Sequence, residues 1–225
     1  MRHDDDMISV IIPTTNAQHL LPRCFDSLIP AAVRGVVREV IVADGGSSDA
    51  TLAIADAAGA HIVHCRANRG VQMADGARTA KSDWLLFLRP ETALETGWDV
   101  EAESFLSQAV MERPRAAVFR FALDDFGGEA RRAEALANLR AAVMALPYGD
   151  QGLLIPKRLY QKLGGYRALS DMEDADLVRR IGRRRLISFR ARAVNVARPK
   201  QSVLRGAVLT LLHKLRVPSR LLANL

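Results

Sequence analysis

Apolar and polar positions follow two patterns in the first half of the chain, one typical of strands and one typical of helices. Short apolar runs of strand character lie at residues 8–12, 40–43, 61–64 and 84–88. Between them, apolar residues recur at helical spacing over residues 17–29, 49–58 and 70–80. This strand-helix alternation predicts an α/β fold whose mixed, mainly parallel sheet carries helices on both faces.

The second half predicts fewer and less regular elements. Helices are expected over residues 96–113, 129–146 and 173–181, and strands over residues 116–123, 151–155 and 186–197. Pro156 is expected at the first position of a short helix, where proline is favoured. There are no internal repeats and no clear linker, so the pattern favours a single domain.

Composition fits a globular protein of the cytoplasm. Of 225 residues, 49% are hydrophobic, enough for an ordinary core. Cys24 and Cys65 are far apart, which argues against a disulfide framework or a structural zinc site and fits a reducing compartment. Residues 1–7 are polar and acidic, unlike a signal peptide, and are expected to be a flexible N-terminus. The sequence contains no apolar run of membrane-spanning length.

Charge is distributed unevenly along the chain. Residues 1–156 hold 15 basic and 21 acidic side chains, whereas residues 157–225 hold 17 basic and 4 acidic ones. Such a basic region suits a surface that meets phosphate, and it equally suits a solvated arginine-rich surface. Residues 203–216 include a basic amphipathic helical pattern that either lies on an anionic membrane or packs on protein.

The first candidate site is the acidic turn D-G-G-S-S-D, which follows the apolar run 40–43. Ligands of open α/β sheets bind at the carboxyl ends of strands. Asp44 can accept hydrogen bonds from a uracil N–H or from ribose hydroxyls, and Gly45 lets a ligand approach the backbone. The structural alternative is an Asx-turn. Ser47 or Ser48 is expected to cap the following helix, and Asp49 to be structural.

Two further segments bring charged groups to the same region. In L-L-F-L-R-P-E-T, Arg89 could meet a diphosphate and Glu91 could ligate Mg²⁺ or Mn²⁺, unless both are solvated turn residues. In S-D-M-E-D-A-D-L, Glu173 and Asp174 repel one another, which would raise the pKa of at least one and suit a general base. The alternative is that these acids only cap a helix, with Ser170 or Asp171 at the cap.

The order of these motifs resembles the family-2 glycosyltransferases of the GT-A fold. The resemblance rests on I-S-V-I-I-P-T-T-N, V-I-V-A-D-G-G-S-S-D-A-T, W-L-L-F-L and M-E-D-A-D-L-V-R-R, and covers roughly residues 8–198. The R-G-x-Q, Y-G-D-Q and M-E-D segments are most similar to the small bacterial radical-SAM/selenium-domain-associated transferases. The implied organisation is one GT-A domain over residues 8–200, followed by a basic amphipathic helical segment over residues 201–225.

The resemblance implies an inverting transfer of sugar from a nucleotide-diphosphate donor, commonly UDP-linked, to an acceptor hydroxyl. Asp174, next to Glu173, would be the base that deprotonates the acceptor. The residues implied on the donor side are Pro13, Thr14, Asp44, Gly45, Arg69, Gln72 and Arg89. Those implied on the acceptor side are Tyr148, Asp150 and Gln151. The acceptor would be a saccharide, a lipid-linked molecule or a small molecule, and nucleic acid is not an expected partner.

The sequence departs from the family at the metal site. Where the family has Asp-x-Asp, this chain has Arg89-Pro90-Glu91. Three interpretations follow: Glu91 alone holds Mg²⁺ or Mn²⁺, Arg89 supplies part of the charge of the metal, or the protein binds nucleotide without turnover.

Two other functions compete with a glycosyltransferase. The first is a catalytically weakened or inactive nucleotide-binding protein that docks on a membrane or another anionic partner. Residues 203–216 would make the contact with the inner face of the membrane. A nucleotidyltransferase is disfavoured because Pro13-Thr14-Thr15-Asn16 replaces a glycine-rich loop after the first strand.

Overall fold

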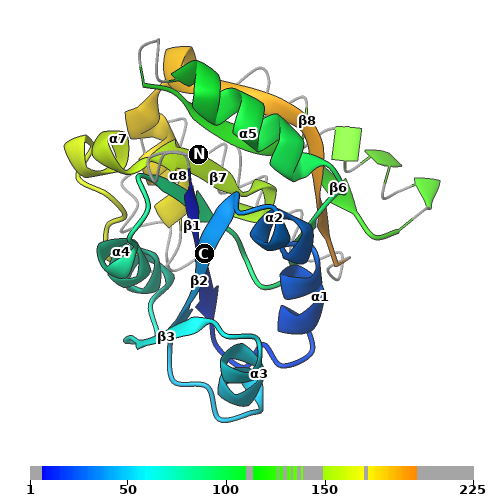
Figure 1. The fold of residues 1–225 in the computed structure, drawn as a ribbon, viewed down its shortest axis with the longest axis vertical. Helices are drawn as coiled ribbons and strands as arrows, with labels where there is room; N and C mark the ends of the chain where they lie inside the picture. Colours follow the sequence, from blue (N-terminus) through cyan, green and yellow to red (C-terminus); the bar gives the residue numbers. More distant parts are fainter. Residues whose placement is uncertain are drawn as a thin grey trace.

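A twisted sheet of eight strands runs through the part of the chain described by the computed structural model (Figure 1). The described residues are 7–109, 114–125, 127–128, 131–132, 134–135, 138, 149–169 and 172–196. The strand order is β3-β2-β1-β4-β7-β6-β8-β5. The mixed α/β fold, mainly parallel in its first half, is as predicted.

The strands differ in direction between the two halves. Their bounds are β1 Ile8–Thr14, β2 Val37–Asp44, β3 His61–His64, β4 Trp84–Phe87, β5 Thr92–Leu94, β6 Ala116–Leu123, β7 Leu153–Pro156 and β8 Leu186–Asn195. Strands β3, β2, β1 and β4 are parallel, so their carboxyl ends lie at one edge. Strand β7 is antiparallel to both β4 and β6, strand β6 is parallel to β8, and β5 is antiparallel to β8.

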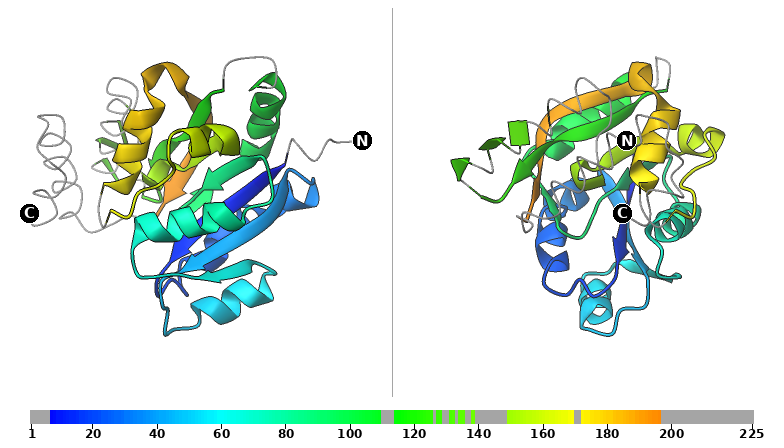
Figure 2. Two further views of the ribbon diagram at one scale, coloured as in Figure 1. Left: turned by 90° about the vertical axis from the view of Figure 1, so that its left-hand side faces the viewer. Right: turned by 180° about the vertical axis from the view of Figure 1, so that it is seen from behind.

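Helices cover both faces of this sheet, and each face has its own apolar core. One core packs under α1 Leu21–Asp26, α2 Ile29–Val33, α3 Thr51–Ala57 and α5 Trp98–Ala109. The other packs under α4 Arg69–Thr79, α7 Lys157–Lys162 and α8 Glu173–Ile181, and Figure 2 shows α4 lying across the parallel strands. In β1, Val10 and Ile12 face the first core while Ile11 faces the second, as the period of a strand requires.

The helix predicted over residues 17–29 is wrong in one respect, because two short helices replace it. Helix α1 ends at Asp26 and α2 begins at Ile29, with Pro30 in its first turn. A continuous helix would need a backbone N–H from Pro30 to bond to the carbonyl of Asp26, and proline has none. The chain therefore restarts the helix at Ile29.

The predicted helix caps also need correction. The N-cap of α3 is Ala50, with no side-chain cap, because Ser47 instead donates to Asp44. Helix α8 begins after Met172, whose φ of 65° is left-handed and whose side chain makes no cap bond. Ser170 and Asp171, predicted as caps, lie outside the described residues.

The elements around β7 are shifted relative to the prediction. Gln151 lies in a 3-10 turn, η2 Gly149–Gln151, and the strand starts only at Leu153. Pro156 ends β7 and is the N-cap of α7, with an extended ψ of 132°, so it is not the first helical residue. A second 3-10 turn, η3 Arg183–Arg185, connects α8 to β8.

Several predictions were incomplete or fall outside the described residues. Strand β5, at Thr92–Leu94, was not predicted, because three residues are too few to show a period. Most of the predicted helix 129–146 and all of residues 197–225 lie outside the described residues. The expected basic helix at 203–216 therefore stays a prediction. Within the described residues, no helix combines the length and apolarity needed to cross a bilayer.

Candidate active site

A cavity of about 430 Å³ opens where the chain leaves β1 and β4. This volume is within the range of small-molecule sites. Its walls are the turn after β1, the start of α4 and the turn after β4, formed by Pro13, Thr14, Thr15, Ala17, Leu20, Ala67, Asn68, Arg69, Gln72, Arg89, Pro90 and Glu91. From β1 the chain crosses to β2 on one side, while β4 lies on the other, and such switch points are where open α/β sheets bind ligands.

Asp44, at the end of β2, is only 1% exposed and is held by its own turn. Its Oδ1 accepts from Thr14 Oγ1 at 3.0 Å and Ser47 Oγ at 2.5 Å, and its Oδ2 accepts from the backbone N–H groups of Gly46 at 2.9 Å and Ser47 at 2.8 Å. Burial opposes ionisation, but these bonds outweigh it and lower the pKa of Asp44. Four bonds fill the acceptor capacity of a carboxylate.

Gln72 and Gly45 bring the start of α4 close to the ends of β1 and β2. The Nε2 of Gln72 donates to the backbone oxygens of Thr14 at 2.7 Å and Ala43 at 2.8 Å, which ties α4 to the ends of β1 and β2. A Cβ on Gly45 would lie 2.8 Å from Thr15 Oγ1 and 3.0 Å from Gln72 Nε2. The structure therefore places Gln72 in the lining of the cavity and Gly45 behind that lining, close to Thr15 and Gln72.

Helix α4 brings Arg69 into the cavity wall. Asn68 caps the helix by accepting from Val71 N at 3.0 Å, so Arg69 projects from its first turn. Arg69 Nη1 donates to Glu173 Oε1 at 3.0 Å. A Cβ on Gly70 would lie 2.0 Å from the backbone oxygen of Arg167, so only glycine allows the loop before α8 to lie this close. The R-G-x-Q motif thus joins α4 to the ends of β1 and β2 through Gln72 and to α8 through Arg69.

Arg89 follows β4 and makes the central ion pair of the site. Its Nη2 donates to Asp174 Oδ2 at 2.9 Å and lies 4.0 Å from Glu173 Oε1. The Arg89 side chain is 12% exposed and the Asp174 side chain 7% exposed. Burial alone would lower the pKa of Arg89, but the charges of Asp174 and Asp150 outweigh it and raise that pKa. Residues 85 positions apart in sequence are therefore brought together in one ion pair.

Glu173 lies beside this pair, at the start of α8, and is 1% exposed. Burial, followed by the negative charge of Asp174, raises its pKa, while Arg69 and Arg89 act in the opposite direction. The prediction of a raised pKa in the Glu173–Asp174 pair thus agrees with the geometry. Two guanidinium groups face two carboxylates, and the proton affinity of Glu173 depends on that balance together with its burial.

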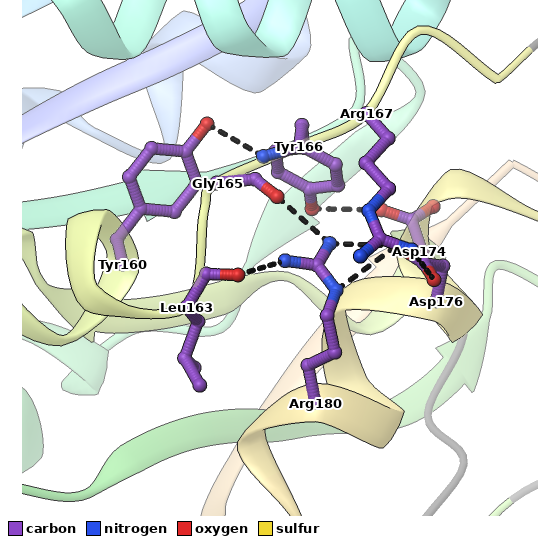
Figure 3. Close-up of polar contacts among 8 residues, drawn as sticks. All are labelled: Tyr160, Leu163, Gly165, Tyr166, Arg167, Asp174, Asp176 and Arg180. Carbon is purple, nitrogen blue, oxygen red and sulfur yellow. Dashed lines mark hydrogen bonds and ion pairs between the residues drawn. The ribbon is translucent and has the colours of Figure 1, made fainter.

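A second layer orients Asp174 from behind (Figure 3). The hydroxyl of Tyr166 donates to Asp174 Oδ1 at 2.8 Å, and the backbone N–H of Tyr166 donates to Tyr160 Oη at 2.9 Å. Arg180 holds the same loop by donating to the backbone oxygens of Leu163 at 2.5 Å and Gly165 at 2.7 Å. Sequence reasoning missed Tyr166, because no pattern in G-G-Y marks a contact eight residues ahead.

The turn Arg89-Pro90-Glu91-Thr92 closes the opposite wall. Thr92 N donates to Arg89 O at 3.0 Å, and Thr92 Oγ1 donates to Asn195 Oδ1 at 2.6 Å, so β8 anchors the turn. Glu91 lines the cavity. Asn195 is a second missed residue, since its partner lies 103 residues earlier in sequence.

The side chains at the predicted metal position do not fit a divalent cation. Hard cations bind several oxygen ligands, and no cluster of three or more His, Cys, Asp or Glu suited to a metal occurs among the described residues. Arg89 brings a positive charge to the position of the first ligand and pairs with Asp174. Glu91 as a cation ligand therefore stays a prediction.

The acceptor-side residues are only partly placed. Asp150 is half-buried, and its charge acts on Arg89. Gln151 is 2% exposed and donates from Nε2 to Phe119 O at 3.2 Å, while its Oε1 is buried without a partner among the described residues. Tyr148 lies outside the described residues.

Comparison with known proteins identifies the family that the first part of the chain matches. Residues 9–89 match the family model described as Glycosyl transferase family 2, so the part of the chain that forms β1 to β4 carries the sequence of that domain. A PGL/p-HBAD biosynthesis glycosyltransferase of Mycobacterium tuberculosis is 37% identical over 95 residues, which are 39% of this chain and 36% of that protein. The match thus spans little more than a third of that relative.

Solved structures show the same fold over almost the whole chain. Glucosyl-3-phosphoglycerate synthase from Mycobacterium tuberculosis, in complex with Mn²⁺, UDP and glucosyl-3-phosphoglycerate, has a TM-score of 0.66 at 20% identity, covering 94% of this chain and 81% of that one. TarS of S. aureus has a TM-score of 0.66 at 17% identity, covering 92% of this chain and 40% of that one. The chain therefore has the GT-A glycosyltransferase fold.

Proposed function

We propose that this protein is an inverting glycosyltransferase that moves a sugar from a nucleotide-diphosphate donor, UDP-linked, to an acceptor hydroxyl. The observation that carries the proposal is the cavity at the ends of β1 and β4, with Arg89 on its wall and Asp174 paired to it. The family-2 match over residues 9–89 supports the reaction class. The UDP bound by glucosyl-3-phosphoglycerate synthase supports the choice of nucleotide.

In this proposal, different residues around the cavity bind the nucleotide and the diphosphate of the donor. Pro13, Thr14 and Gly45 lie where the nucleotide would sit. Asp44 supports that surface through its hydrogen-bonded turn. Its carboxylate already accepts four hydrogen bonds, so a uracil N–H would have to share an oxygen with an existing donor. Arg69 and Arg89 offer guanidinium groups to the diphosphate, whose geometry they match.

Asp174 is the proposed base. The acceptor hydroxyl would attack the anomeric carbon opposite the diphosphate and give its proton to Asp174. The bond from sugar to diphosphate breaks, and the leaving group takes both electrons. Tyr166 orients the carboxylate through its 2.8 Å bond to Oδ1, and the guanidinium groups stabilise the departing charge.

A second candidate function is nucleotide binding without turnover. It is favoured by the observation that both oxygens of Asp174 already accept hydrogen bonds, one from Tyr166 and one from Arg89. An anionic membrane contact of such a protein through residues 203–216 stays a prediction. Likeness to the small radical-SAM/selenium-domain-associated transferases likewise stays a prediction.

Nucleotide binding tests both candidates at once. At a hundredfold excess over its Kd, UDP should stabilise the fold by about 2.7 kcal/mol, because it binds only the folded state. We expect thermal unfolding to shift upward with UDP and far less with inorganic phosphate. No shift at millimolar UDP, with or without Mn²⁺, contradicts both candidates. Release of UDP from a panel of UDP-sugars then separates the enzyme from the binding protein.

A further inference from the structure

The guanidinium of Arg89 has one donor that the described protein leaves unused. One nitrogen, Nη2, donates to Asp174 Oδ2 at 2.9 Å. The Nε, on the same edge of the guanidinium as Nη2, is buried and has no hydrogen-bond partner among the described residues. Buried polar groups are nearly always hydrogen-bonded, so an unpartnered donor on a residue that lines the cavity marks a place where an acceptor would bind.

The same residue lines the cavity together with Arg69. Arg69 projects from the first turn of α4, an eleven-residue helix whose N-terminus favours negative charge. An anion that accepts from Arg89 Nε would therefore also lie near a second guanidinium and a positive helix end. Phosphate oxygens match the planar fork of arginine.

Arg89 links a carboxylate to the cavity in the way a divalent cation would. A metal at this position would bind carboxylate oxygens on one side and diphosphate oxygens on the other. Here Nη2 of the guanidinium binds the carboxylate of Asp174, and the neighbouring Nε is a donor that a diphosphate oxygen could use. A divalent cation added beside Arg89 would meet its positive charge directly, which disfavours binding.

We infer that this protein binds the diphosphate of its donor without a divalent cation, because Arg89 bridges Asp174 and the diphosphate. The inference rests on the proposed function, since it assumes a nucleotide diphosphate in this cavity. It also explains the replacement of an acidic residue by Arg89: the cation of the site is part of the chain. Glu91 then lines the cavity without holding a metal.

The test compares UDP binding by the full chain in EDTA and in Mn²⁺, measured by isothermal titration calorimetry. We expect the two dissociation constants to agree within about threefold, because the metal adds no contact to the diphosphate. A tenfold difference would correspond to about 1.4 kcal/mol of binding free energy. Binding that is at least tenfold tighter in Mn²⁺ overturns the inference and leaves the proposed function intact. Absence of binding in both solutions overturns the proposed function and the inference with it.

Variants of Arg89 give a second readout. In EDTA, Arg89→Met should weaken UDP binding at least tenfold, and Mn²⁺ should not restore it. Arg89→Lys keeps the charge but lacks the planar guanidinium with its Nε donor, so its loss of UDP binding should be intermediate. Arg78→Met is the matched control, because Arg78 is exposed on α4 and pairs with Asp75 outside the cavity lining. Unchanged UDP binding in a folded Arg89→Met protein overturns the inference.

Discussion

Two acidic regions meet at the same edge of the sheet, and their charges are balanced in different ways. Asp44 is surrounded by uncharged donors from its own turn and from Thr14, which lower its pKa. Glu173 and Asp174 lie side by side on α8, and two arginines from distant segments balance them. Burial and the charge of Asp174 raise the pKa of Glu173.

The two regions should therefore respond differently when an anionic ligand binds in the cavity. The Asp44 turn satisfies its charge locally, so a ligand changes little there. The Glu173–Asp174 pair depends on Arg69 and Arg89, which also line the cavity. An anion that binds these arginines changes the balance around the proposed base. The following variants test this contrast.

Removal of Arg89 should have the largest effect on stability. Arg89→Met leaves Asp174 and Glu173 buried with one guanidinium fewer, and breaking a buried ion pair from one side typically costs about 3–5 kcal/mol. Urea denaturation should show this loss in the free energy of unfolding. Arg78→Met should change it by less than about 1 kcal/mol, because its pair is exposed. Equal effects of the two variants would contradict the proposed contrast.

Gly70→Ala should come next. The added Cβ would lie 2.0 Å from Arg167 O, so the backbone on one side must move, at a cost of about 1–3 kcal/mol. Because Arg69 is the neighbouring residue, UDP binding should weaken too. Gly128→Ala is the control, since a Cβ there meets nothing within 4 Å. Chemical denaturation of both variants checks the prediction, and an unchanged Gly70→Ala protein would show that this contact is not tight.

Asp44→Asn tests the locally satisfied region through pH. Because the folded-state pKa of Asp44 is lowered, its ionised form stabilises the fold above the unfolded pKa of about 3.9, and this contribution is lost as pH falls through the folded pKa. The variant should be less stable than the wild type by about 1–2 kcal/mol at pH 7. The difference should shrink below about pH 4. Thermal unfolding across pH measures it, and a constant difference would contradict the assignment.

Glu173→Gln should have the smallest effect and the opposite sign. The raised pKa of Glu173 favours the protonated form in the folded state, so folding is penalised as pH rises above the unfolded value of about 4.3. Glutamine removes the repulsion with Asp174 and should stabilise the protein by about 1 kcal/mol at pH 7. The gain should vanish below about pH 4. A destabilised variant at pH 7 would mean that the ion pair with Arg69 outweighs burial.

The sequence predicted the regular elements and the clustering of charge, but not how each charge is satisfied. Strand-helix alternation was sufficient for β1 to β4, and helix α8 was predicted with its observed bounds, Glu173–Ile181. The pairing of Arg89 with Asp174 joins residues 85 positions apart and depends on the sheet bringing both to one edge. Tyr166 and Asn195 were missed because their roles are defined only by three-dimensional contact.

The most direct test of the central claim measures sugar transfer or donor hydrolysis and UDP affinity on the same Asp174→Asn protein. The account predicts that release of UDP from the UDP-sugar that the wild type uses falls at least about 100-fold, the typical contribution of a general base, while the Kd for UDP stays within about threefold. Asp75→Asn, which removes the partner of the exposed Arg78 outside the cavity lining, should keep its turnover. Turnover that survives in Asp174→Asn would contradict the assignment of Asp174 as the base.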